Sequence, residues 1–350
     1  MFPSHLKDID VTLTGREVRL ARRPTGLPGL EHFAVVEVPV PQPGDGEVLV
    51  RNLWFRLSAS IRMMISEGAE AVEGVPFPAI GIGDPLAEDA IGEVVAAPAG
   101  SGLTPGDLLC HVKGWRDYAL LKVGEGRRVD PAVPDPTLAL SHGWTAYAAL
   151  TRAVTVGRGE TVFVSSAAGA IGSMAGQIAR QLGAGRVIGS TSTRAKARRL
   201  VEELGYTAAV CREAGPIEDQ LRRAAPDGID ITLDMTGGDQ LAAAVSVAAP
   251  KGRIIVLGAL SGQLAPDGTG RVAPVTLDSF QLLVKALSLK GYSADDDPDA
   301  VPEWEQRSGA WLRNGAIRFA KTTVQGLDRA PAALAEVSRG DHFGVTIVEL

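Results

Sequence analysis

The sequence predicts an α/β protein in which a β-rich domain is joined to a doubly wound parallel sheet. Short apolar runs broken by Gly and Pro fill the first third of the chain, which is typical of a barrel or sandwich. From about residue 160 apolar runs alternate with helical segments instead, as in a parallel sheet covered on both faces. With 350 residues, of which 45% are hydrophobic, the chain is long enough for two such domains.

Five apolar runs predict the strands of the first domain. Turn-forming stretches such as PGDG (43–46) and GSGLTPGD (100–107) separate them. A stretch that begins near a proline, 134–141, then predicts a helix. The five predicted strands cover residues 33–41, 47–59, 90–99, 107–112 and 116–123.

Six further apolar runs predict the parallel sheet, and helical segments with a period near 3.6 follow most of them. A helix at 304–315 comes next, and the last residues predict a strand, a helix and a final strand that would return to the first domain. We therefore expect one domain from residues 1–132 and 316–350, and a second from 133–315. The six runs are 161–166, 185–191, 207–211, 228–236, 252–260 and 285–292.

Composition argues against several functional classes. A formal net charge of −6 argues against nucleic acid as the main partner, because phosphate binding needs a basic face. The two cysteines, Cys110 and Cys211, have no ligand-type spacing, which excludes a disulfide framework and a cysteine-based zinc site. The stretch MFPSHLKDIDVTL has no signal-peptide pattern, and no uncharged apolar run reaches about 18 residues. We expect a cytoplasmic protein with no membrane contact.

Residues 163–183, FVSSAAGAIGSMAGQIARQLG, nearly match the dinucleotide fingerprint G-x-G-x-x-G. Ala167 stands in the first place. Gly169 would let the backbone approach a pyrophosphate, and Gly172 would let a helix at 170–182 pack close to its strand. The N-terminus of that helix would offer free N–H groups to the phosphates. On this motif alone, a tight turn without a ligand remains an alternative.

The second strand of the sheet indicates which nucleotide would bind. NAD-specific sites place an acid about 20 residues after the glycines, yet no acid occurs between Glu160 and Glu202. A 2′-phosphate needs cations, and the hydroxyls of Ser190 and Thr191 would add donors. NADP(H) is therefore favoured, although a solvated helix face would also explain some of the charges. The basic residues of this window are Arg180, Arg186, Arg194, Lys196, Arg198 and Arg199.

Several motifs occur in an order that resembles a known family. SAAGAIGSMAGQIARQLG, KGRIIVLGALSG and GDHFGVTIVEL, with EVLVRNLWFRLSASIRMMI and HGWTAYAAL upstream, resemble the zinc-independent medium-chain dehydrogenase/reductases. The branch is the leukotriene B4 12-hydroxydehydrogenase/prostaglandin reductase group, which includes NADPH-dependent alkenal double-bond reductases. The resemblance implies a GroES-like domain, a Rossmann domain and a homodimer. Ser58–Ser60 occupy the region of the catalytic cysteine of zinc-dependent relatives, so no metal is expected.

The resemblance also implies the site residues. Lys196 and Arg212 would hold the 2′-phosphate, and His342 takes the place of a usual Asn near the cofactor. The inferred catalytic residues are Tyr292, Ser60, which replaces a pocket tyrosine, and Arg62. The remaining cofactor contacts would be Gly169, Ala170, Ile171 and Gly172 at the pyrophosphate, and Thr145, Gly258, Ala259, Leu260, Tyr292 and Ser293 around the nicotinamide and its ribose.

The implied reaction is hydride transfer from NADPH to the β-carbon of an α,β-unsaturated carbonyl compound, with hydrogen-bond donors at the carbonyl oxygen. Arg62 would pair with a substrate carboxylate or a polyphenol, or else form a salt bridge within its domain.

A zinc-free quinone oxidoreductase and a non-catalytic NADPH-binding regulator remain alternatives. The Ala-, Gly- and Arg-rich composition suggests a place in secondary (polyketide) metabolism. We interpret Asp84, Glu88 and Asp89 as solvated.

Overall fold

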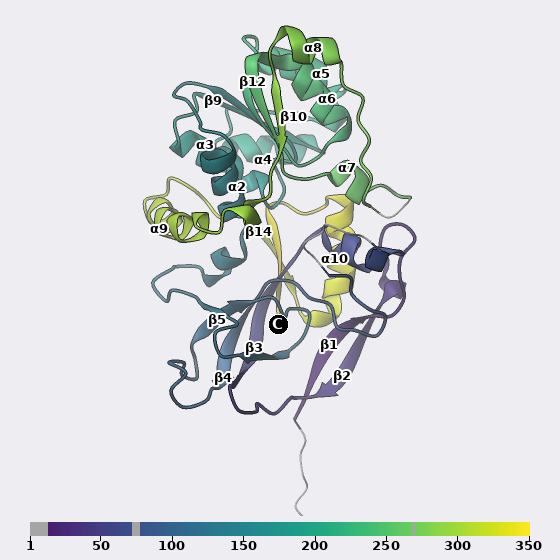
Figure 1. Ribbon diagram of the computed structural model, residues 1–350, viewed down its shortest axis with the longest axis vertical. Helices are drawn as coiled ribbons and strands as arrows, with labels where there is room; N and C mark the ends of the chain where they lie inside the picture. The colour runs from purple at the N-terminus through teal and green to yellow at the C-terminus, as the bar shows by residue number, and fades with distance from the viewer. Residues whose placement is uncertain (1–12, 72–77, 268–269) are drawn as a thin grey trace, which may run out of the picture.

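The computed structural model describes residues 13–71, 78–267 and 270–350. The N-terminal stretch 1–12, for which no signal sequence is expected, lies outside the described residues. Figure 1 shows two bodies stacked along the long axis, with the parallel sheet and its helices at one end. The strands of the first third and the C-terminal segment form the other end.

The upper body contains a six-stranded parallel sheet, and all six predicted strands are confirmed. Its order reverses between β8 and β11, because β9 and β10 extend to one side and β12 and β13 to the other. Ligands of such sheets bind in the crevice at this reversal, outside the carboxyl ends of the strands. The strands in spatial order are β10 (Ala208–Cys211), β9 (Arg186–Thr191), β8 (Thr161–Val164), β11 (Ile229–Asp234), β12 (Ala248–Val256) and β13 (Ser288–Gly291).

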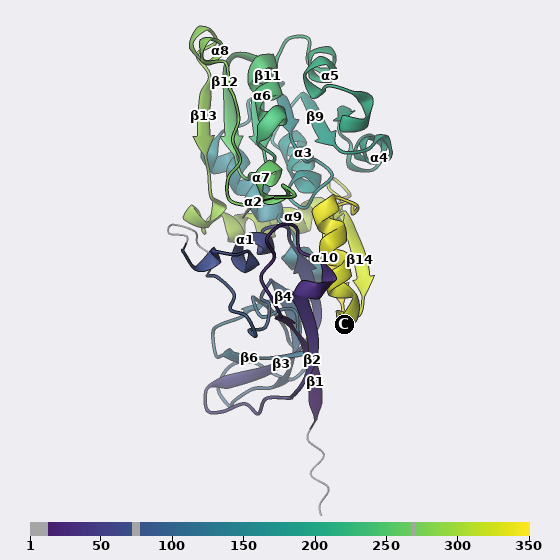
Figure 2. The same cartoon turned by 90° about the vertical axis from the view of Figure 1, so that its right-hand side faces the viewer.

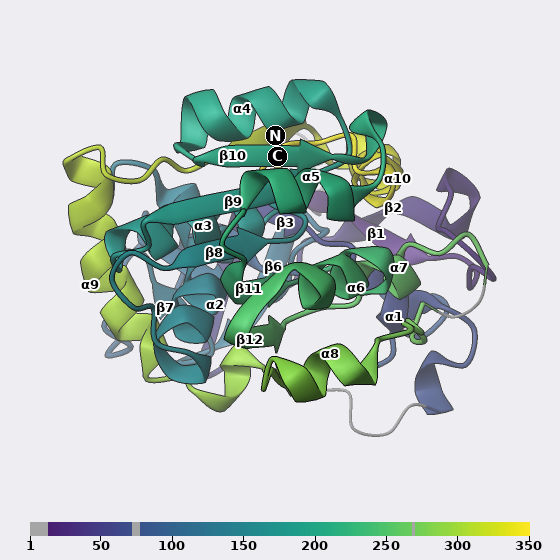
Figure 3. The same ribbon diagram turned by 90° about the horizontal axis from the view of Figure 1, so that it is seen from above.

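Helices cover both faces of this sheet, as Figure 3 shows from above. Successive side chains of a strand point to opposite faces, so Val162 and Val164 of β8 enter one core and Phe163 enters the other. The first core lies under α2 (Gly143–Ala148), α3 (Gly172–Gln181), α4 (Arg194–Leu204) and α9 (Ala300–Arg313). The second lies under α5 (Ile217–Ala224) and α6 (Gly238–Val247). Burial on both faces explains why the central strand β8, TVFV, is almost wholly apolar in sequence.

The lower body contains a seven-stranded sheet and a separate antiparallel pair, β1 (Thr14–Leu20) with β2 (Phe33–Pro39). The five strands predicted in the first third are confirmed. The sequence did not predict β1, where Val18 and Leu20 are buried between charged residues that break the apolar run. The larger sheet consists of β14 (Lys321–Gln325), β15 (Val345–Glu349), β3 (Glu47–Leu57), β4 (Ala90–Ala96), β5 (Leu108–His111) and β7 (Arg127–Arg128), with β6 (Tyr118–Lys122) on β3.

The C-terminal segment joins this lower sheet. β15 pairs antiparallel with β3, so the last strand returns to the N-terminal strands as expected. Between β14 and β15, α10 (Ala330–Arg339) places Leu334 in the same core as Phe55 of β3. Figure 2 shows α10 and β14 beside the strands of the first third. The domain boundaries themselves, 1–132 with 316–350 and 133–315, stay predictions.

Two predicted helices begin later than the sequence indicated. The segment 134–141 forms a 3-10 turn, Pro136–Leu140, and the regular helix α2 follows it. The helix expected at 170–182 begins at Gly172, because residues 165–171 make a turn. Among the residues that the structure describes, no helix combines the length and apolarity that a bilayer crossing requires.

Candidate active site

The turn between β8 and α3 explains the missing first glycine of the fingerprint. The left-handed residue of this turn is Ser166, with φ +50°, whereas Ala167 has no positive φ. The N–H of Ala167 donates to the carbonyl of Ser190 at 2.8 Å, and the N–H of Ser166 donates to the Ser190 hydroxyl at 3.1 Å. Neighbouring strand β9 thus holds the turn, and no glycine is needed at position 167.

The other two fingerprint positions differ in how strictly they need glycine. A Cβ added to Gly172 would lie 2.5 Å from the Cα of Ala167, which no side chain tolerates. At Gly169 the added Cβ would meet Ser166 atoms at 3.2 Å, a milder contact. The first turn of α3 therefore packs directly on the turn, and the N–H of Ser173 donates to the Gly169 carbonyl at 2.9 Å. This compact, glycine-dependent approach suits a pyrophosphate.

A buried acid joins the two central strands at the crevice. The carboxylate of Asp234, at the end of β11, accepts from the Ser165 hydroxyl at 2.7 Å and from the Gly237 N–H at 2.8 Å. Burial raises the pKa of Asp234, and these hydrogen bonds oppose that rise. Since its oxygens are occupied by the protein's own donors, Asp234 holds the crevice walls together.

Three cations lie together beyond the end of β9. Burial lowers the pKa of Lys196, and the nearby charges of Arg199 and Arg212 lower it further, while Asp341 opposes them. The Lys196 ammonium donates to the carbonyl of Gly340, at the end of α10. Cations that disfavour one another in this way suit a dianion such as a 2′-phosphate.

Besides Asp341 and Glu203, which pairs with Arg199, the structure places a further acid in this region. Glu213 follows β10, and its carboxylate accepts from the backbone N–H of Arg194 at the start of α4, at 2.9 Å. Glu213 lies beyond the acid-free window, so only the pairing of β10 with β9 brings it here. It would oppose a 2′-phosphate and partly offset the cations.

The predicted hydroxyl donors are buried. Ser190 has no exposed surface, and its hydroxyl donates to the side-chain oxygen of Gln240. Thr191 is 7% exposed. In the structure Ser190 fastens the turn rather than facing the crevice, and the cofactor contact of both residues stays a prediction.

The segments expected around the nicotinamide meet at the carboxyl ends of β11–β13. Gly258, Ala259 and Leu260 follow β12 and are half-buried, and Leu260 donates its N–H to the carbonyl of Met235 at 3.0 Å. Thr145 lies half-buried in the first turns of α2. The structure therefore brings the segment 258–260 to the edge at which β11 ends.

Tyr292 follows β13, and its hydroxyl donates to the carboxylate of Asp297 at 2.6 Å. Burial raises the pKa of the Tyr292 phenol, and the Asp297 carboxylate raises it further. The phenol therefore keeps its proton at any physiological pH, but its hydroxyl already donates a hydrogen bond to Asp297. The next residue, Ser293, is exposed. The sequence interpretation missed Asp297, although it belongs to the acidic run 295–297.

His342 is held by the C-terminal segment of the lower body. Its ring nitrogens lie 2.9 Å from the Glu336 carboxylate and 2.9 Å from the Thr346 hydroxyl. Two residues later, the Gly344 N–H donates to the carbonyl of Ala168 in the fingerprint turn, at 2.8 Å. His342 thus lies near the crevice with both nitrogens engaged.

Arg62 connects the two bodies. It lies in α1 (Ile61–Ile65), is 1% exposed, and donates to the carbonyls of Gln263 at 2.6 Å and Ala265 at 2.5 Å. In return, Arg271 donates to the carbonyls of Met63 at 3.0 Å and Gly68 at 2.7 Å. This pair of arginines fixes α1 against the loop that follows Leu260. Contact of Arg62 with a substrate stays a prediction.

Glu88 corrects one sequence expectation. We expected it to be solvated with Asp84 and Asp89, but it is only 9% exposed, because it points at Arg56 of β3. Burial raises the pKa of Glu88 to about 7, with Arg56 opposing and Asp89 adding to the rise. The Ser58 hydroxyl also opposes the rise in the pKa of Glu88, and it lies against the hydroxyl of Ser60.

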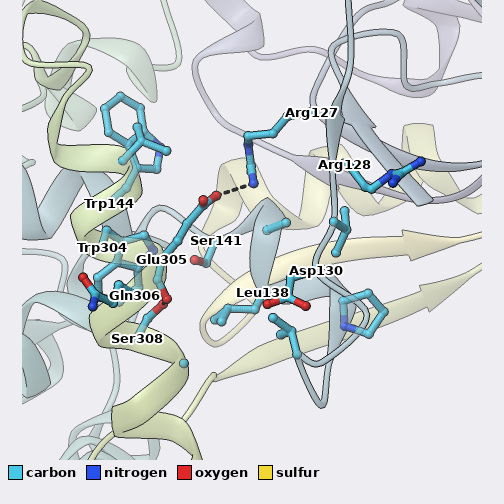
Figure 4. Close-up of a pocket in the computed structure, with 16 residues that line it drawn as sticks. Arg127, Arg128, Asp130, Leu138, Ser141, Trp144, Trp304, Glu305, Gln306 and Ser308 are labelled. Carbon is cyan, nitrogen blue, oxygen red and sulfur yellow. Dashed lines mark hydrogen bonds and ion pairs between the residues drawn. The ribbon is translucent and has the colours of Figure 1, made fainter. Parts of the chain in front are cut away.

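A separate cavity of about 230 Å³ lies between α9 and the segment 127–141 (Figure 4). Trp144 and Trp304 form one wall, and the Arg127–Glu305 ion pair crosses it. None of the predicted cofactor or catalytic residues lines this cavity. It is therefore distinct from the crevice described above.

A β-rich body joined to a doubly wound sheet, with a glycine-dependent turn at the strand-order reversal, defines a nucleotide-dependent oxidoreductase class. Two family models match the chain: "N-terminal domain of oxidoreductase" over residues 16–129 and "Zinc-binding dehydrogenase" over 170–307. Within the described parts of the chain, no three His, Cys, Asp or Glu side chains come together as a metal site. The residues present thus do not fit the zinc in that description.

Similar proteins narrow the class further. A putative NADP-dependent oxidoreductase of Bacillus subtilis is 31% identical over 97% of this chain and 99% of its own. An NADPH-dependent curcumin reductase of Escherichia coli is 28% identical, over 95% of each chain. The crystal structure of CurA from Vibrio vulnificus in complex with NADPH has a TM-score of 0.84 at 29% identity, covering 95% of this chain and 98% of that one. The chain belongs to the medium-chain dehydrogenase/reductase family, in its zinc-independent branch.

Proposed function

We propose that this protein is an NADPH-dependent enoyl reductase, which reduces the C=C bond of an α,β-unsaturated carbonyl compound. Two observations support the cofactor: the glycine-dependent turn, and the basic side chains of Lys196, Arg199 and Arg212, of which Arg199 is also paired with Glu203. The relatives support the reaction, since they include a curcumin reductase and a structure with NADPH. Curcumin is itself a conjugated enone.

The chain's own residues would hold NADPH across the crevice. The N-terminus of α3, with Gly169, Ala170, Ile171 and Gly172, would receive the pyrophosphate, and Lys196 with Arg212 the 2′-phosphate. Thr145, the segment 258–260, Tyr292 and Ser293 would surround the nicotinamide end, and His342 would lie near the cofactor. When bound, NADPH supplies the hydride for the β-carbon of the substrate.

Stabilisation of the developing enolate falls to hydrogen-bond donors of the protein. Ser60 is half-buried at the start of α1, which Arg62 fixes against the loop after Leu260. Arg62 of this helix contacts Gln263, which follows the predicted nicotinamide segment 258–260. Tyr292 becomes a donor to substrate only when its hydroxyl turns away from Asp297. We propose Ser60 as the first donor and Tyr292 as the second, with Arg62 holding their surroundings.

Parallel assays test this proposal. Oxidation of NADPH is followed at its absorbance maximum with a 2-alkenal, a cyclic enone and a quinone, and products are identified by mass spectrometry. We expect the saturated aldehyde or ketone from the first two substrates. Exclusive formation of a quinol would support the quinone oxidoreductase instead. Tight NADPH binding without turnover of any acceptor would support the non-catalytic regulator.

We also propose a homodimer formed through the edge of the parallel sheet. β13 is the edge strand, and all four of its residues are exposed. Next to it, α8 (Ser279–Val284) exposes Phe280 by 65% and Leu283 by 74%. Unpaired strand edges beside apolar side chains favour association. Sedimentation of the wild type and of a Leu283→Glu variant tests this, and a monomeric wild type would contradict it.

The cytoplasm remains the proposed location, which free thiols at Cys110 and Cys211 support. A role in polyketide metabolism stays a prediction from composition.

A further inference from the structure

We propose that Phe343, in the C-terminal segment, is a positioning residue for cofactor specificity: its ring holds the Arg199 guanidinium so that Arg199 joins Lys196 at the 2′-phosphate of NADPH. The inference rests on the proposed NADPH-dependent function and deepens it. It places part of the cofactor preference in the lower body, whereas the sequence places the 2′-phosphate contacts in the upper body alone.

Lys196 and Arg199 share one face of α4, because residues three apart on a helix are neighbours. This helix begins directly after β9, the strand at whose end dinucleotide-binding sheets hold the adenosine ribose. The charge of Arg199 lowers the pKa of Lys196, as the charge of a nearby cation does. This face of α4 therefore presents two cations where the 2′-phosphate is expected.

The C-terminal segment contacts the same face of α4 at two points. The Lys196 ammonium donates to the Gly340 carbonyl, which ends α10. The guanidinium carbon of Arg199 lies over the Phe343 ring, 3.8 Å from its centroid, in a cation–π contact. Phe343 is 3% exposed and packs in the core under α3 and α4. The lower body thus supplies the support on which Arg199 rests.

The backbone around Phe343 holds the ring in place. The Phe343 N–H donates to the Thr322 hydroxyl at 3.2 Å, and that hydroxyl donates to the Phe343 carbonyl at 3.0 Å. Gly344 has φ +76°, and an added Cβ would overlap the carbonyl oxygen of Ala320. The Gly344 N–H donates to the carbonyl of Ala168 at 2.8 Å. Phe343 is therefore fixed between β14 and the turn expected to receive the pyrophosphate.

Two contacts orient the Arg199 guanidinium. Glu203, one turn later on α4, accepts from Nε at 2.6 Å and from Nη2 at 3.0 Å, while Phe343 packs against the guanidinium. Nη1 takes part in neither of the Glu203 bonds, and the Arg199 side chain is 46% exposed, so an anion can reach it. A planar group held on two sides loses little rotamer freedom when it binds a phosphate.

The acids near this face make orientation matter more than net charge. Glu203 offsets much of the charge of Arg199, and Asp341, which opposes the lowering of the Lys196 pKa, is paired with Arg339 at 3.0 Å. Arg199 would therefore favour a 2′-phosphate through directed hydrogen bonds rather than through a long-range field. Directed bonds depend on where the guanidinium is held, which gives Phe343 its role.

Binding of an adenosine fragment tests the inference without the nicotinamide site. The fragments 2′,5′-ADP and 5′-AMP differ only in the 2′-phosphate, so the ratio of their dissociation constants measures the contribution of that group. We expect Arg199→Ala to lower the preference for 2′,5′-ADP about fivefold, and Phe343→Leu about threefold. Arg198→Ala, which removes the same charge from the neighbouring exposed position, is the control and should lower it less.

A double-mutant cycle tests whether Phe343 acts through Arg199. In protein that carries Phe343→Leu, the further change Arg199→Ala should add little to the loss of preference. NMR of the protein without cofactor gives a second measurement. The Phe343 ring should shift the Nε–H signal of Arg199 upfield, Phe343→Leu should abolish that shift, and 2′,5′-ADP, unlike 5′-AMP, should move the signal in the wild type.

Each failure has its own signature. An unchanged preference in Arg199→Ala would overturn the inference, and this exposed substitution tests it even where Phe343→Leu fails to fold. Additive losses in the double variant, or equal weakening of both fragments in Phe343→Leu, would overturn the positioning role of Phe343. Wild-type protein that prefers 2′,5′-ADP yet reduces no C=C bond would contradict the proposed function alone.

Discussion

The hydroxyl of Tyr292 donates to the carboxylate of Asp297 at 2.6 Å, so the phenol nearest the predicted nicotinamide site is already engaged. A neighbouring carboxylate disfavours a phenolate, and burial does so more strongly. We expect Asp297→Asn to lower the pKa of Tyr292, measured by ultraviolet difference titration. Tyr292→Phe identifies the signal as a control. An unchanged alkaline titration in Asp297→Asn would refute the coupling.

Arg62 should matter for stability and for cofactor affinity together. Arg62→Ala removes charged donors from the carbonyls of Gln263 and Ala265, and we expect a loss of about 3 kcal/mol of unfolding free energy. The KM for NADPH should rise, because the loop after Leu260 loses its support. Calorimetry and steady-state kinetics measure both effects. Arg271→Ala, on the exposed side of the same contact, should lower the unfolding free energy by less than Arg62→Ala does. Equal losses in the two variants would contradict this interpretation.

The fingerprint glycines should respond unequally to alanine. Gly172→Ala forces a Cβ to 2.5 Å from the Cα of Ala167, so we expect a clear loss of thermal stability and of NADPH binding. Gly169→Ala meets Ser166 at 3.2 Å and should be milder on stability. Melting curves and cofactor fluorescence titrations compare the two variants. A Gly172→Ala protein with wild-type melting behaviour would show that the turn can relax.

The charges beyond β9 should set cofactor preference in opposite directions. Lys196→Ala should weaken NADPH binding about tenfold and leave NADH binding nearly unchanged, because only NADPH carries the 2′-phosphate. Glu213→Gln should strengthen NADPH binding, since it removes the carboxylate at the start of α4. Dissociation constants for both cofactors test the pair. Equal losses for both cofactors in Lys196→Ala would disprove the 2′-phosphate assignment.

Glu88 should make stability depend on pH. Its folded-state pKa of about 7 exceeds the ordinary value, so the folded protein binds more protons than the unfolded chain between about pH 4.5 and 7. The unfolding free energy should therefore fall as the pH rises through this window, by up to about 3 kcal/mol from this group. Denaturant melts across the window should show a smaller fall in Glu88→Gln. Parallel curves for the two proteins would exclude the effect.

The sequence by itself determined the fold class and the fingerprint turn. Alternating apolar and helical runs specify a two-faced sheet, because each strand must be apolar on both sides to be buried on both. The need for glycine at position 172 was predictable in the same way, because the strand and the helix that pack closely there are neighbours along the chain. The strand β1 was missed because charged side chains surround its two buried apolar side chains, Val18 and Leu20.

Only the tertiary structure decided which polar groups meet. Glu88 and Arg56 are 32 positions apart, Arg62 and Gln263 are 201 apart, and Glu213 reaches α4 because β10 lies next to β9. Whether a carboxylate is solvated or buried beside an arginine depends on these long-range contacts, and so does its pKa. The spacing of residues along the sequence does not reveal these long-range contacts. The residues of the cofactor site stay predictions from the sequence, whereas the burial of Glu88 beside Arg56 could be found only in the tertiary structure.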